Sequence, residues 1–528
     1  MDIYKIKLLY HTVKYLKPIQ VYYRLYYFIR NILIEKKVKK KTLANFGSIV
    51  WKNGFSYENS YLDKDDSFTF LNFSHSFSDK IDWNFNQFGK LWTYNLNYFD
   101  FLNQKNISKE TGLQLIQDFI KNDALLKDGK EPYPISLRAI NWVKFLSNNQ
   151  IKDAVINNTL YYHYCILFKN LEYHLLGNHL LENAFSLLFG AYYFQDEKLY
   201  NKSYDLLISE LNEQVLKDGA HFELSPMYHQ IILTRLYDSI QLIKLNSAWK
   251  KNDLLLFLEQ KASLMFSWLK NMTYKNGEVP MVNDSTYNIA LSSKKLFDYA
   301  KHLGILNQKI PLSDSGYRKI ISNNYELFID VGNVGPDYQP AHAHSDTFSF
   351  EFFYKERPII VDTGISTYEK NSSRQLERST QSHNTIRVDG KDSSEVWGGF
   401  RVARRAKIIS IKEDENNIAA THDGYKRIGA FHTRKFNKLS QKLIIKDVID
   451  SKKMHQIESF LHFHPDCNIS VKENKIMIDS EITITFKNHR NLIVQEYDFP
   501  LGYNRTKKAC KIRTLTEKES KIEIAYEN

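Results

Sequence analysis

The sequence has 528 residues, 43% of them apolar and 25% charged, and this length exceeds what one hydrophobic core usually supports, so we expect two domains. The net charge of +12, from 72 Lys and Arg against 60 Asp and Glu, suits a polyanionic partner such as an acidic polysaccharide. Nucleic acid is not expected, because the chain lacks zinc-finger spacing, an RNP-like aromatic motif and a long basic stripe. The three cysteines have no CxxC spacing and predict neither disulfides nor a thiolate metal site.

The first 41 residues are basic and rich in tyrosine. Lys and Arg interrupt the apolar runs, which excludes an ordinary spanning helix, and the cleavage site of a secretory signal is missing. We therefore expect a cytoplasmic or peripherally membrane-associated protein, with a periplasmic or secreted location as the alternative. Residues 1–85 are predicted to form a basic helical segment that packs on the body, and contact with an anionic membrane surface is the alternative for its basic N-terminus.

The periodicity of apolar residues changes once along the remaining chain. From 86 to 315 they recur at helical spacing, as in LQLIQDFI and DLLLFLEQKASLMFSWLK. From 316 to 528 short alternating runs such as TFSFEFFY and KIMIDSEITITF are separated by Gly, Asn and Asp. The predicted fold class is multidomain α+β, a helical array followed by a large antiparallel β-sandwich domain.

Two polar clusters interrupt the helical half. In HLLGNHLLENAF an otherwise apolar helix is predicted to carry His174, Asn178, His179, Glu182 and Asn183, and buried polar groups must be hydrogen-bonded or functional. A satisfied polar seam between helices explains this segment equally well. In the second cluster, ELSPMYHQ, the pair Ser225-Pro226 predicts a helix start, with Tyr228 and His229 in its first turn.

The third cluster opens the strand-rich half. His342 and His344 are two residues apart, Asp362 follows in a separate strand, and His383 follows in the next segment. Two imidazoles and one carboxylate from adjacent strands are a reasonable zinc ligand set. A lone HxH pair is more often structural, and the accompanying VDTG and SHNT segments favour the metal.

The elements GNHLLEN, SPMYHQ, AHAHSDTFSF, RPIIVDTGISTY and STQSHNTI occur in this order over roughly residues 90 to 400. In this ordered set the sequence resembles the heparinase II/III family of polysaccharide lyases, and it is similar also to alginate and oligoalginate lyases of the same architecture. The resemblance implies an incomplete (α/α) toroid followed by a β-sandwich domain, with the active cleft between them.

The resemblance also implies roles for the matched residues. Asn178 and His179 would neutralise the carboxylate of a uronate, Tyr228 would act as base and acid, and His342 would face it across the cleft. A structural Zn²⁺ would be held by His344, Asp362 and His383, and Glu182 matches a supporting acidic position that we assign to substrate binding. The implied reaction is β-elimination on an acidic polysaccharide or oligosaccharide.

The elimination needs these residue types, because the C5 proton of a uronate leaves only if the negative charge growing on the carboxyl group is stabilised. A Tyr or His must then take that proton, while a second group or the same Tyr protonates the departing C4 oxygen. Arg can clamp carboxylates or sulfates, and six side chains are candidate glycan contacts. They are Arg138, Trp142, Trp397, Arg401, Arg404 and Arg405.

Two other functions remain open at this stage. A non-catalytic protein for glycan binding or assembly would keep the scaffold and the aromatic and Arg contacts without turnover. A glycoside hydrolase would need two carboxylates at the scissile bond, for which Glu182, Glu223 and Asp284 are available. Because the N-terminus lacks a recognisable secretory signal, we expect a role in capsule or O-antigen metabolism and not attack on an external polymer. The glycan, its sulfation, and endo or exo action do not follow from the sequence.

Overall fold

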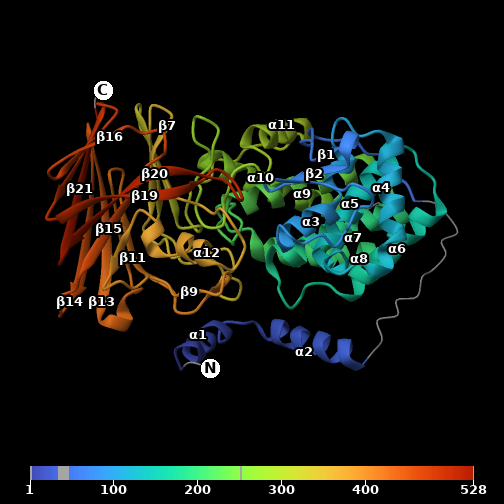
Figure 1. Cartoon of the computed structure of the whole chain (residues 1–528), viewed down its shortest axis with the longest axis horizontal. Helices are drawn as coiled ribbons and strands as arrows, with labels where there is room; N and C mark the ends of the chain where they lie inside the picture. The colour runs from blue at the N-terminus through green and yellow to red at the C-terminus, as the bar shows by residue number, and fades with distance from the viewer. Residues whose placement is uncertain (1–2, 34–46, 250–251, 527–528) are drawn as a thin grey trace.

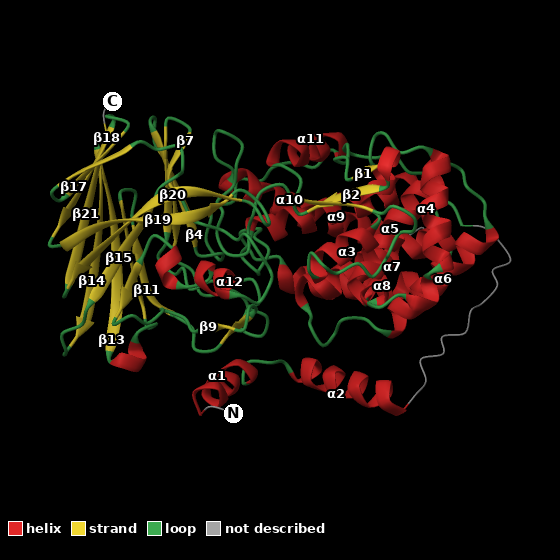
Figure 2. Cartoon of the chain, in the orientation of Figure 1, coloured by secondary structure: helices red, strands yellow, loops and turns green. Residues whose placement is uncertain are grey.

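The computed structural model describes residues 3–33, 47–249 and 252–526. Helices gather in one half of the molecule and strands in the other, as Figure 1 shows along the chain and Figure 2 by element type. This confirms the predicted fold class. The helical half ends with α11 at Leu303, and the strand-rich half begins with β4 at Tyr317.

The helical half is an incomplete toroid of paired helices. Its inner helices follow one another around the array, because α5 packs on α7 and α7 packs on α9. Burial supports this order, since almost every side chain of α7 and α9 is buried, whereas α8 exposes much of one face. The helices are α3 Lys90–Tyr98, α4 Lys109–Lys121, α5 Pro132–Asn148, α6 Ala154–Lys169, α7 Gly177–Phe194, α8 Glu197–Gln214, α9 Pro226–Leu245, α10 Asn252–Met272 and α11 Ser293–Leu303.

The strand-rich half contains an eight-stranded antiparallel sheet in the order β11-β12-β13-β14-β21-β18-β17-β16. Two four-stranded sheets, β4-β5-β6-β7 and β19-β20-β15-β8, pack against it, and one apolar core joins Phe352 and Leu461 of these sheets to Ile445 and Ile522 of the large one. The alternating burial of β14 fits a strand with one face in this core.

The strands of the large sheet are β11 Ile408–Glu413, β12 Asn417–His422, β13 Ala430–Leu439, β14 Lys442–Ser451, β16 Ile469–Lys472, β17 Lys475–Ile478, β18 Ile482–Lys487 and β21 Glu519–Tyr526. The smaller sheets contain β4 Tyr317–Ile321, β5 Tyr325–Asp330, β6 Phe350–Tyr354, β7 Arg357–Ile360, β8 Ile386–Val388, β15 Ile457–His462, β19 Arg490–Pro500 and β20 Thr506–Thr516. A short hairpin, β9 Val396–Trp397 and β10 Arg401–Val402, and the helix α12 Ser372–Glu377 lie between β7 and β11.

The N-terminal segment is helical only in part. The helices α1 Ile3–Val13 and α2 Pro18–Leu33 are followed by a three-stranded sheet of β1 Tyr61–Leu62, β2 Ser67–Phe70 and β3 Phe73–Ser76. The expectation of a helical segment over 1–85 was therefore wrong for this sheet. The alternation in SFTF gives the signal, with Phe68 and Phe70 buried against Phe101 and Trp92. In the described part of the chain no helix combines the length and apolar character needed to cross a membrane.

Candidate active site

Three segments far apart in the sequence bring polar side chains together where the toroid meets the β-sandwich domain. Asn178 lies at the start of α7, Tyr228 in the first turn of α9, and His342 in the loop between β5 and β6. The Asn178 amide nitrogen is 3.4 Å from His342 Nε2, and the rings of Tyr228 and His342 are 3.9 Å apart between centroids. Three of the four predicted catalytic residues thus form one cluster, and His179 follows Asn178 directly.

The start of α7 is fixed by the buried carboxylate of Glu223. One Glu223 oxygen accepts from the backbone N–H of Asn178 at 3.0 Å, and the other accepts from its side-chain amide at 2.8 Å. Gly177 makes this approach possible, because a Cβ atom there would lie 2.4 Å from the Glu223 carboxylate and the backbone has a φ of +60°. The Asn178 amide is therefore held in one orientation.

His179 is partly exposed, with 30% of its side chain accessible. Its Nδ1 lies 3.0 Å from Glu172 Oε1, and Asn183 donates to the other oxygen of Glu172 at 3.0 Å. Burial by itself lowers the pKa of His179, but the Glu172 carboxylate outweighs it with help from Glu223, so the pKa is raised above 6.5. His179 thus keeps Nε2 for a ligand and is readily protonated.

The start of α9 confirms the helix start predicted at Ser225-Pro226. Pro226 is in the first turn, and the Ser225 hydroxyl accepts from the backbone N–H of Tyr228 at 3.3 Å, as an N-cap does. The Tyr228 hydroxyl lies 3.0 Å from that of Tyr368. Burial is the main cause that raises the pKa of Tyr228 well above 10, with Tyr503 adding to it, so Tyr228 is a neutral phenol and a proton donor.

His342 is oriented by Asp284, from the loop after α10. His342 Nδ1 lies 2.9 Å from Asp284 Oδ2, and Arg374 of α12 binds both oxygens of Asp284 at 2.5 and 2.7 Å. Burial alone would raise the pKa of Asp284, but Arg374 and the two neighbouring histidines reverse this and hold it well below its usual value. A charged Asp284 accepts a hydrogen bond from Nδ1–H of His342, which leaves Nε2 unprotonated beside the Asn178 amide nitrogen.

The three residues predicted to hold zinc are neighbours in the structure. His383 Nδ1 lies 2.9 Å from Asp362 Oδ2, the rings of His344 and His383 are 5.3 Å apart, and His344 Nε2 lies 2.9 Å from Asp284 Oδ1. The buried atoms His344 Nδ1 and His383 Nε2 have no hydrogen-bond partner. Within the described residues, however, no group of three or more His, Cys, Asp or Glu side chains is arranged to hold a metal ion.

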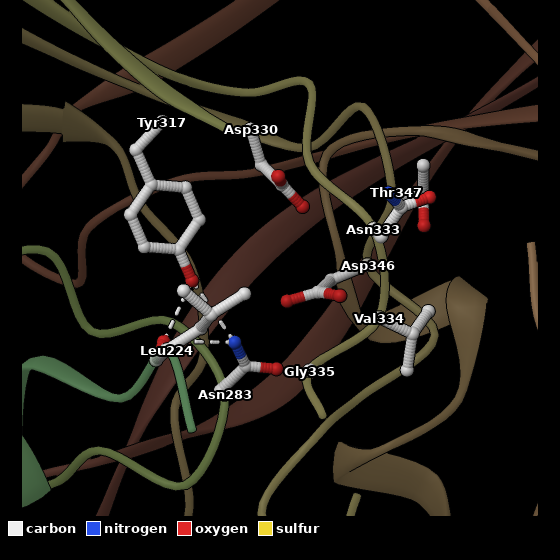
Figure 3. Close-up of a pocket in the computed structure, with 9 residues that line it drawn as sticks. All are labelled: Leu224, Asn283, Tyr317, Asp330, Asn333, Val334, Gly335, Asp346 and Thr347. Atoms are coloured by element: carbon white, nitrogen blue, oxygen red, sulfur yellow. Dashed lines mark hydrogen bonds between the residues drawn. The ribbon is translucent and has the colours of Figure 1, made fainter. Parts of the chain in front are cut away.

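A small polar pocket lies behind this cluster (Figure 3). Figure 3 shows Asp330 and Asp346 lining it, with Asn283 donating to the Leu224 carbonyl and to the Tyr317 hydroxyl at 3.0 Å each. Burial raises the pKa of Asp346 to about 6, and Asp362 adds to this shift. The pocket contains none of the four predicted catalytic side chains, but it borders them, since Asn283 precedes Asp284 and Leu224 follows Glu223.

Three of the predicted glycan contacts are buried in the helical half. Arg138 is fully buried, donates to the backbone carbonyls of Asn97 and Gly129, and lies over the Phe119 ring. Glu182 is also buried, and its Oε1 is held 2.7 Å from Nε of Arg235 on α9. Both residues lie on inner helices of the toroid. Their polar groups bind neighbouring parts of the toroid and do not face a ligand. Trp142, another candidate, is likewise fully buried.

Trp397 and Arg401 face each other across the β9–β10 hairpin. The Arg401 guanidinium lies 4.8 Å from the Trp397 ring centre, and the Trp397 indole donates to the Thr12 hydroxyl of α1 at 3.1 Å. The pair therefore lies beside α1. Phe400 of the same hairpin contacts Tyr368, with ring centroids 5.3 Å apart, so it approaches the cluster more closely.

His174 was expected on the same helix as Asn178, but α7 begins only at Gly177. The preceding Leu176 has a φ of +64°, a conformation that ends any helical continuation from His174. His174 instead lies edge-on to Tyr27 of α2, with ring centroids 5.5 Å apart. The two residues therefore belong to different surroundings.

Several residues that complete the cluster had no predicted role in the site. Glu223 and Asp284 were predicted only as possible carboxylates of a hydrolase, and no role was predicted for Tyr368 in the segment DTGISTY. Their contacts with Asn178, His342 and Tyr228 join positions 45, 58 and 140 residues apart. Only the position of Glu223, two residues before Ser225-Pro226, was a usable signal.

Comparison with known families matches most of this chain. A family model described as heparinase II/III N-terminus matches residues 135–304, and one described as heparinase II/III-like, C-terminal, matches residues 306–527. A heparin-sulfate lyase from Bacteroides thetaiotaomicron is 26% identical over 249 residues, which cover 38% of this chain and 34% of the relative. One from Pedobacter heparinus is 24% identical over 263 residues, covering 44% and 39%. The aligned part thus spans well under half of these relatives.

Solved structures share the fold over a longer part of the chain. A crystal structure of heparinase III has a TM-score of 0.63 at 15% identity and covers 96% of this chain and 91% of its own. A mutant heparan sulfate lyase from Pedobacter heparinus has a TM-score of 0.56 at 15% identity, covering 88% and 81%. These similarities support the combination of a helical toroid and a β-sandwich domain.

Proposed function

The chain belongs to the heparinase II/III family, and we propose that it is a polysaccharide lyase that cleaves an acidic, uronate-containing glycan by β-elimination. The observation that carries the proposal is the convergence of a fixed amide, an oriented imidazole and a protonated phenol. Asn178 supplies the amide and Tyr228 the phenol, and both contact His342, which supplies the imidazole. Each group answers one requirement of the reaction.

The first requirement is to stabilise the charge that grows on the uronate carboxyl group when its C5 proton leaves. Asn178 and His179 are adjacent donors for this task. Glu223 holds the Asn178 amide, while Glu172 binds Nδ1 of His179 and keeps Nε2 directed elsewhere. Because neither donor has to reorganise, both stabilise the developing charge better than water does.

The second requirement is a base for the C5 proton and an acid for the departing oxygen. We assign the base to His342 Nε2, since Nδ1–H donates a hydrogen bond to the charged Asp284 and Nε2 is left as the basic nitrogen. The acid is Tyr228, whose raised pKa keeps its proton in the resting enzyme. The C5–H bond breaks toward His342, its electron pair forms the C4=C5 double bond, the C4–O4 bond breaks, and O4 takes the proton of Tyr228. No water is consumed.

This assignment divides between two residues the roles that the family resemblance gives to Tyr228 alone. If Tyr228 served as both base and acid, its phenolate would have to form first, and the buried surroundings oppose that. A pH profile separates the two assignments. With His342 as base, the reaction does not need the Tyr228 phenolate, so activity is already present below the alkaline range. With Tyr228 as base, it rises only toward the alkaline range.

The hydrolase alternative has little support from the carboxylates near the cluster. Asp284 binds Arg374 through both oxygens and its pKa is held well below the usual value, so it is not a proton donor. Glu223 is occupied by two donors of Asn178, and Glu182 by Arg235. A hydrolase needs one protonated and one free carboxyl group at the scissile bond.

We also propose that His344, Asp362 and His383 hold a structural zinc ion. The residues suit it, because each histidine has one buried nitrogen without a partner and Asp362 lies beside His383. Asp284 would orient the His344 ring through its hydrogen bond with Nε2, as carboxylates do at zinc sites. Zinc would supply rigidity to the loop that carries His342.

Metal analysis of the purified protein should give about one zinc per chain, and His344→Ala should lose it. A purified protein that contains no metal, and whose thermal stability does not change after chelation, would contradict the zinc site.

The experiment that tests the main proposal follows ultraviolet absorbance during incubation with uronate glycans. Elimination leaves a 4,5-unsaturated uronyl end that absorbs, whereas hydrolysis leaves none. Heparan sulfate, hyaluronan, alginate and the producing cell's own polysaccharide form the panel. Tight binding to one glycan without any absorbance change would favour the non-catalytic accessory function.

A further inference from the structure

The two N-terminal helices expose an unusual amount of apolar surface. Of the 34 large apolar side chains exposed in the described part of the chain, 14 lie between residues 3 and 32, and Ile3, Ile32 and Phe28 are 71, 66 and 64% exposed. These 14 are Ile3, Tyr4, Ile6, Leu9, Tyr10, Val13, Ile19, Val21, Tyr22, Leu25, Tyr26, Phe28, Ile29 and Ile32. Contiguous exposed apolar surface of this kind marks an interaction site.

The helix α2 is oriented with its polar face toward the protein. Gln20 is fully buried and donates to the Leu175 carbonyl at 3.1 Å, Arg24 donates to that of His174 at 3.2 Å, and Arg30 to that of Lys169 at 2.7 Å. Positions 20, 24, 27 and 30 share one helix face, so residues 22, 25, 29 and 32 point away from the body. A helix that only covers the domain would bury its apolar face instead.

The same two helices carry charge of one sign. Residues 3–33 contain six Lys and Arg and no Asp or Glu. Five more lysines occur at positions 36–41, which lie outside the described residues. The exposed side chains also include several tyrosines and a phenylalanine, residues that suit the boundary between a bilayer and water.

We propose that α1 and α2 form a docking surface for an anionic lipid bilayer, on which both helices lie flat. The apolar face would enter the headgroup boundary while Lys5, Lys7 and Lys14 at α1 meet anionic headgroups. The other three basic side chains bind the body of the protein, Lys17 through Glu213 and Arg24 and Arg30 through backbone carbonyls. Flat binding agrees with the absence, among the described helices, of one able to cross a membrane. Basic and aromatic residues together, with no acidic residue, favour lipid over a protein partner of mixed charge.

The position of the two helices fits this surface. Figure 1 shows α1 and α2, in blue, running along one side of the molecule past both halves. The Thr12 side chain of α1 contacts the β9–β10 hairpin, and Gln20 at the start of α2 reaches the carbonyls of Leu175 and Tyr338. Those two carbonyls lie three and four residues before Asn178 and His342. Docking would therefore hold one edge of the candidate active site near the bilayer, whichever reaction the site performs.

Vesicle flotation of the full chain tests the proposal. The vesicles are phosphatidylcholine alone or mixed with phosphatidylglycerol, and the variants are Leu25→Glu/Phe28→Glu and a control, Ile409→Glu/Val494→Glu, on exposed strands of the β-sandwich domain. We expect binding to the mixed vesicles that weakens with added salt, falls at least about tenfold in the α2 variant, and is unchanged in the control. Circular dichroism and gel filtration confirm that both variants are folded.

Three results would overturn the proposal. In the first, the unmodified chain floats with neither kind of vesicle. In the second, the control variant loses as much binding as the α2 variant. In the third, light scattering after gel filtration detects a dimer that Leu25→Glu/Phe28→Glu dissociates, without vesicle binding. That last result would assign the apolar surface to a second copy of the chain.

Discussion

The ring of Tyr228 lies against the imidazole of His342, with centroids 3.9 Å apart and an interplanar angle of 30°. The two residues come from different halves of the molecule, α9 of the toroid and the β5–β6 loop of the β-sandwich domain. Their contact therefore depends on how the halves pack. Whatever binds between them meets a phenol and an imidazole side by side.

Replacing Tyr228 by Phe should remove the proton donor while keeping the ring contact with His342. We expect kcat to fall about 10²- to 10⁴-fold, the usual contribution of general acid catalysis, with little change in glycan binding. Tyr161→Phe, which removes a hydroxyl bound to Asp196 on the outer side of the toroid, is the matched control. Equal rates for the Tyr228 variant and the unmodified protein would rule out Tyr228 as the acid.

Glu223→Gln tests whether the orientation of Asn178 matters. The amide can accept from only one of the two Asn178 donors, so the Asn178 side chain should lose its fixed position. We expect kcat/KM to fall about 10- to 100-fold, a smaller loss than removing a direct donor costs. Glu458→Gln, a carboxylate bound to Arg387 and Arg513 in the β-sandwich domain, should leave kinetics unchanged. An unaffected Glu223→Gln enzyme would contradict the positioning role.

The raised pKa of His179 predicts how binding depends on pH. Burial lowers this pKa but Glu172 outweighs it, so the folded enzyme keeps the charged imidazolium at a higher pH than an ordinary histidine. Since the charge is lost as pH rises through the raised pKa, KM should increase on the alkaline side. Glu172→Gln removes the main raising influence and should move this increase to lower pH. A KM profile that does not shift in Glu172→Gln would refute the assignment.

Arg138→Met separates a packing role from a glycan contact. Arg138 is buried and donates hydrogen bonds to two backbone carbonyls. Its replacement should therefore change the free energy of unfolding by about 1–3 kcal/mol, while KM stays the same. Thermal unfolding and KM are measured on the same preparation. A KM at least about tenfold higher, with unchanged unfolding, would restore the sequence-based prediction of a glycan contact.

Much of the fold follows from the sequence because local patterns determine it. The helical and strand periodicities predict the two halves, and Ser225-Pro226 predicts the start of α9. The family segments contain Asn178, Tyr228 and His342, which the structure brings together. Those predictions rest on spacing and motif, which the sequence carries directly.

The rest depends on contacts between distant segments. The sequence does not show that Glu223 holds Asn178 or that Arg374 neutralises Asp284, because each pair joins separate elements. Nor does composition distinguish a buried Arg138 from one that faces a ligand. The orientation of α2 is a further case, since its spacing predicts two faces without indicating which one meets the protein.

The central claim is that this protein performs β-elimination, and ultraviolet absorbance measured with the glycan panel tests it most directly. The account predicts that absorbance rises with at least one uronate glycan for the unmodified protein and for Tyr161→Phe, and that Tyr228→Phe gives almost none. New reducing ends released without any gain in absorbance would show hydrolysis instead and would contradict the account.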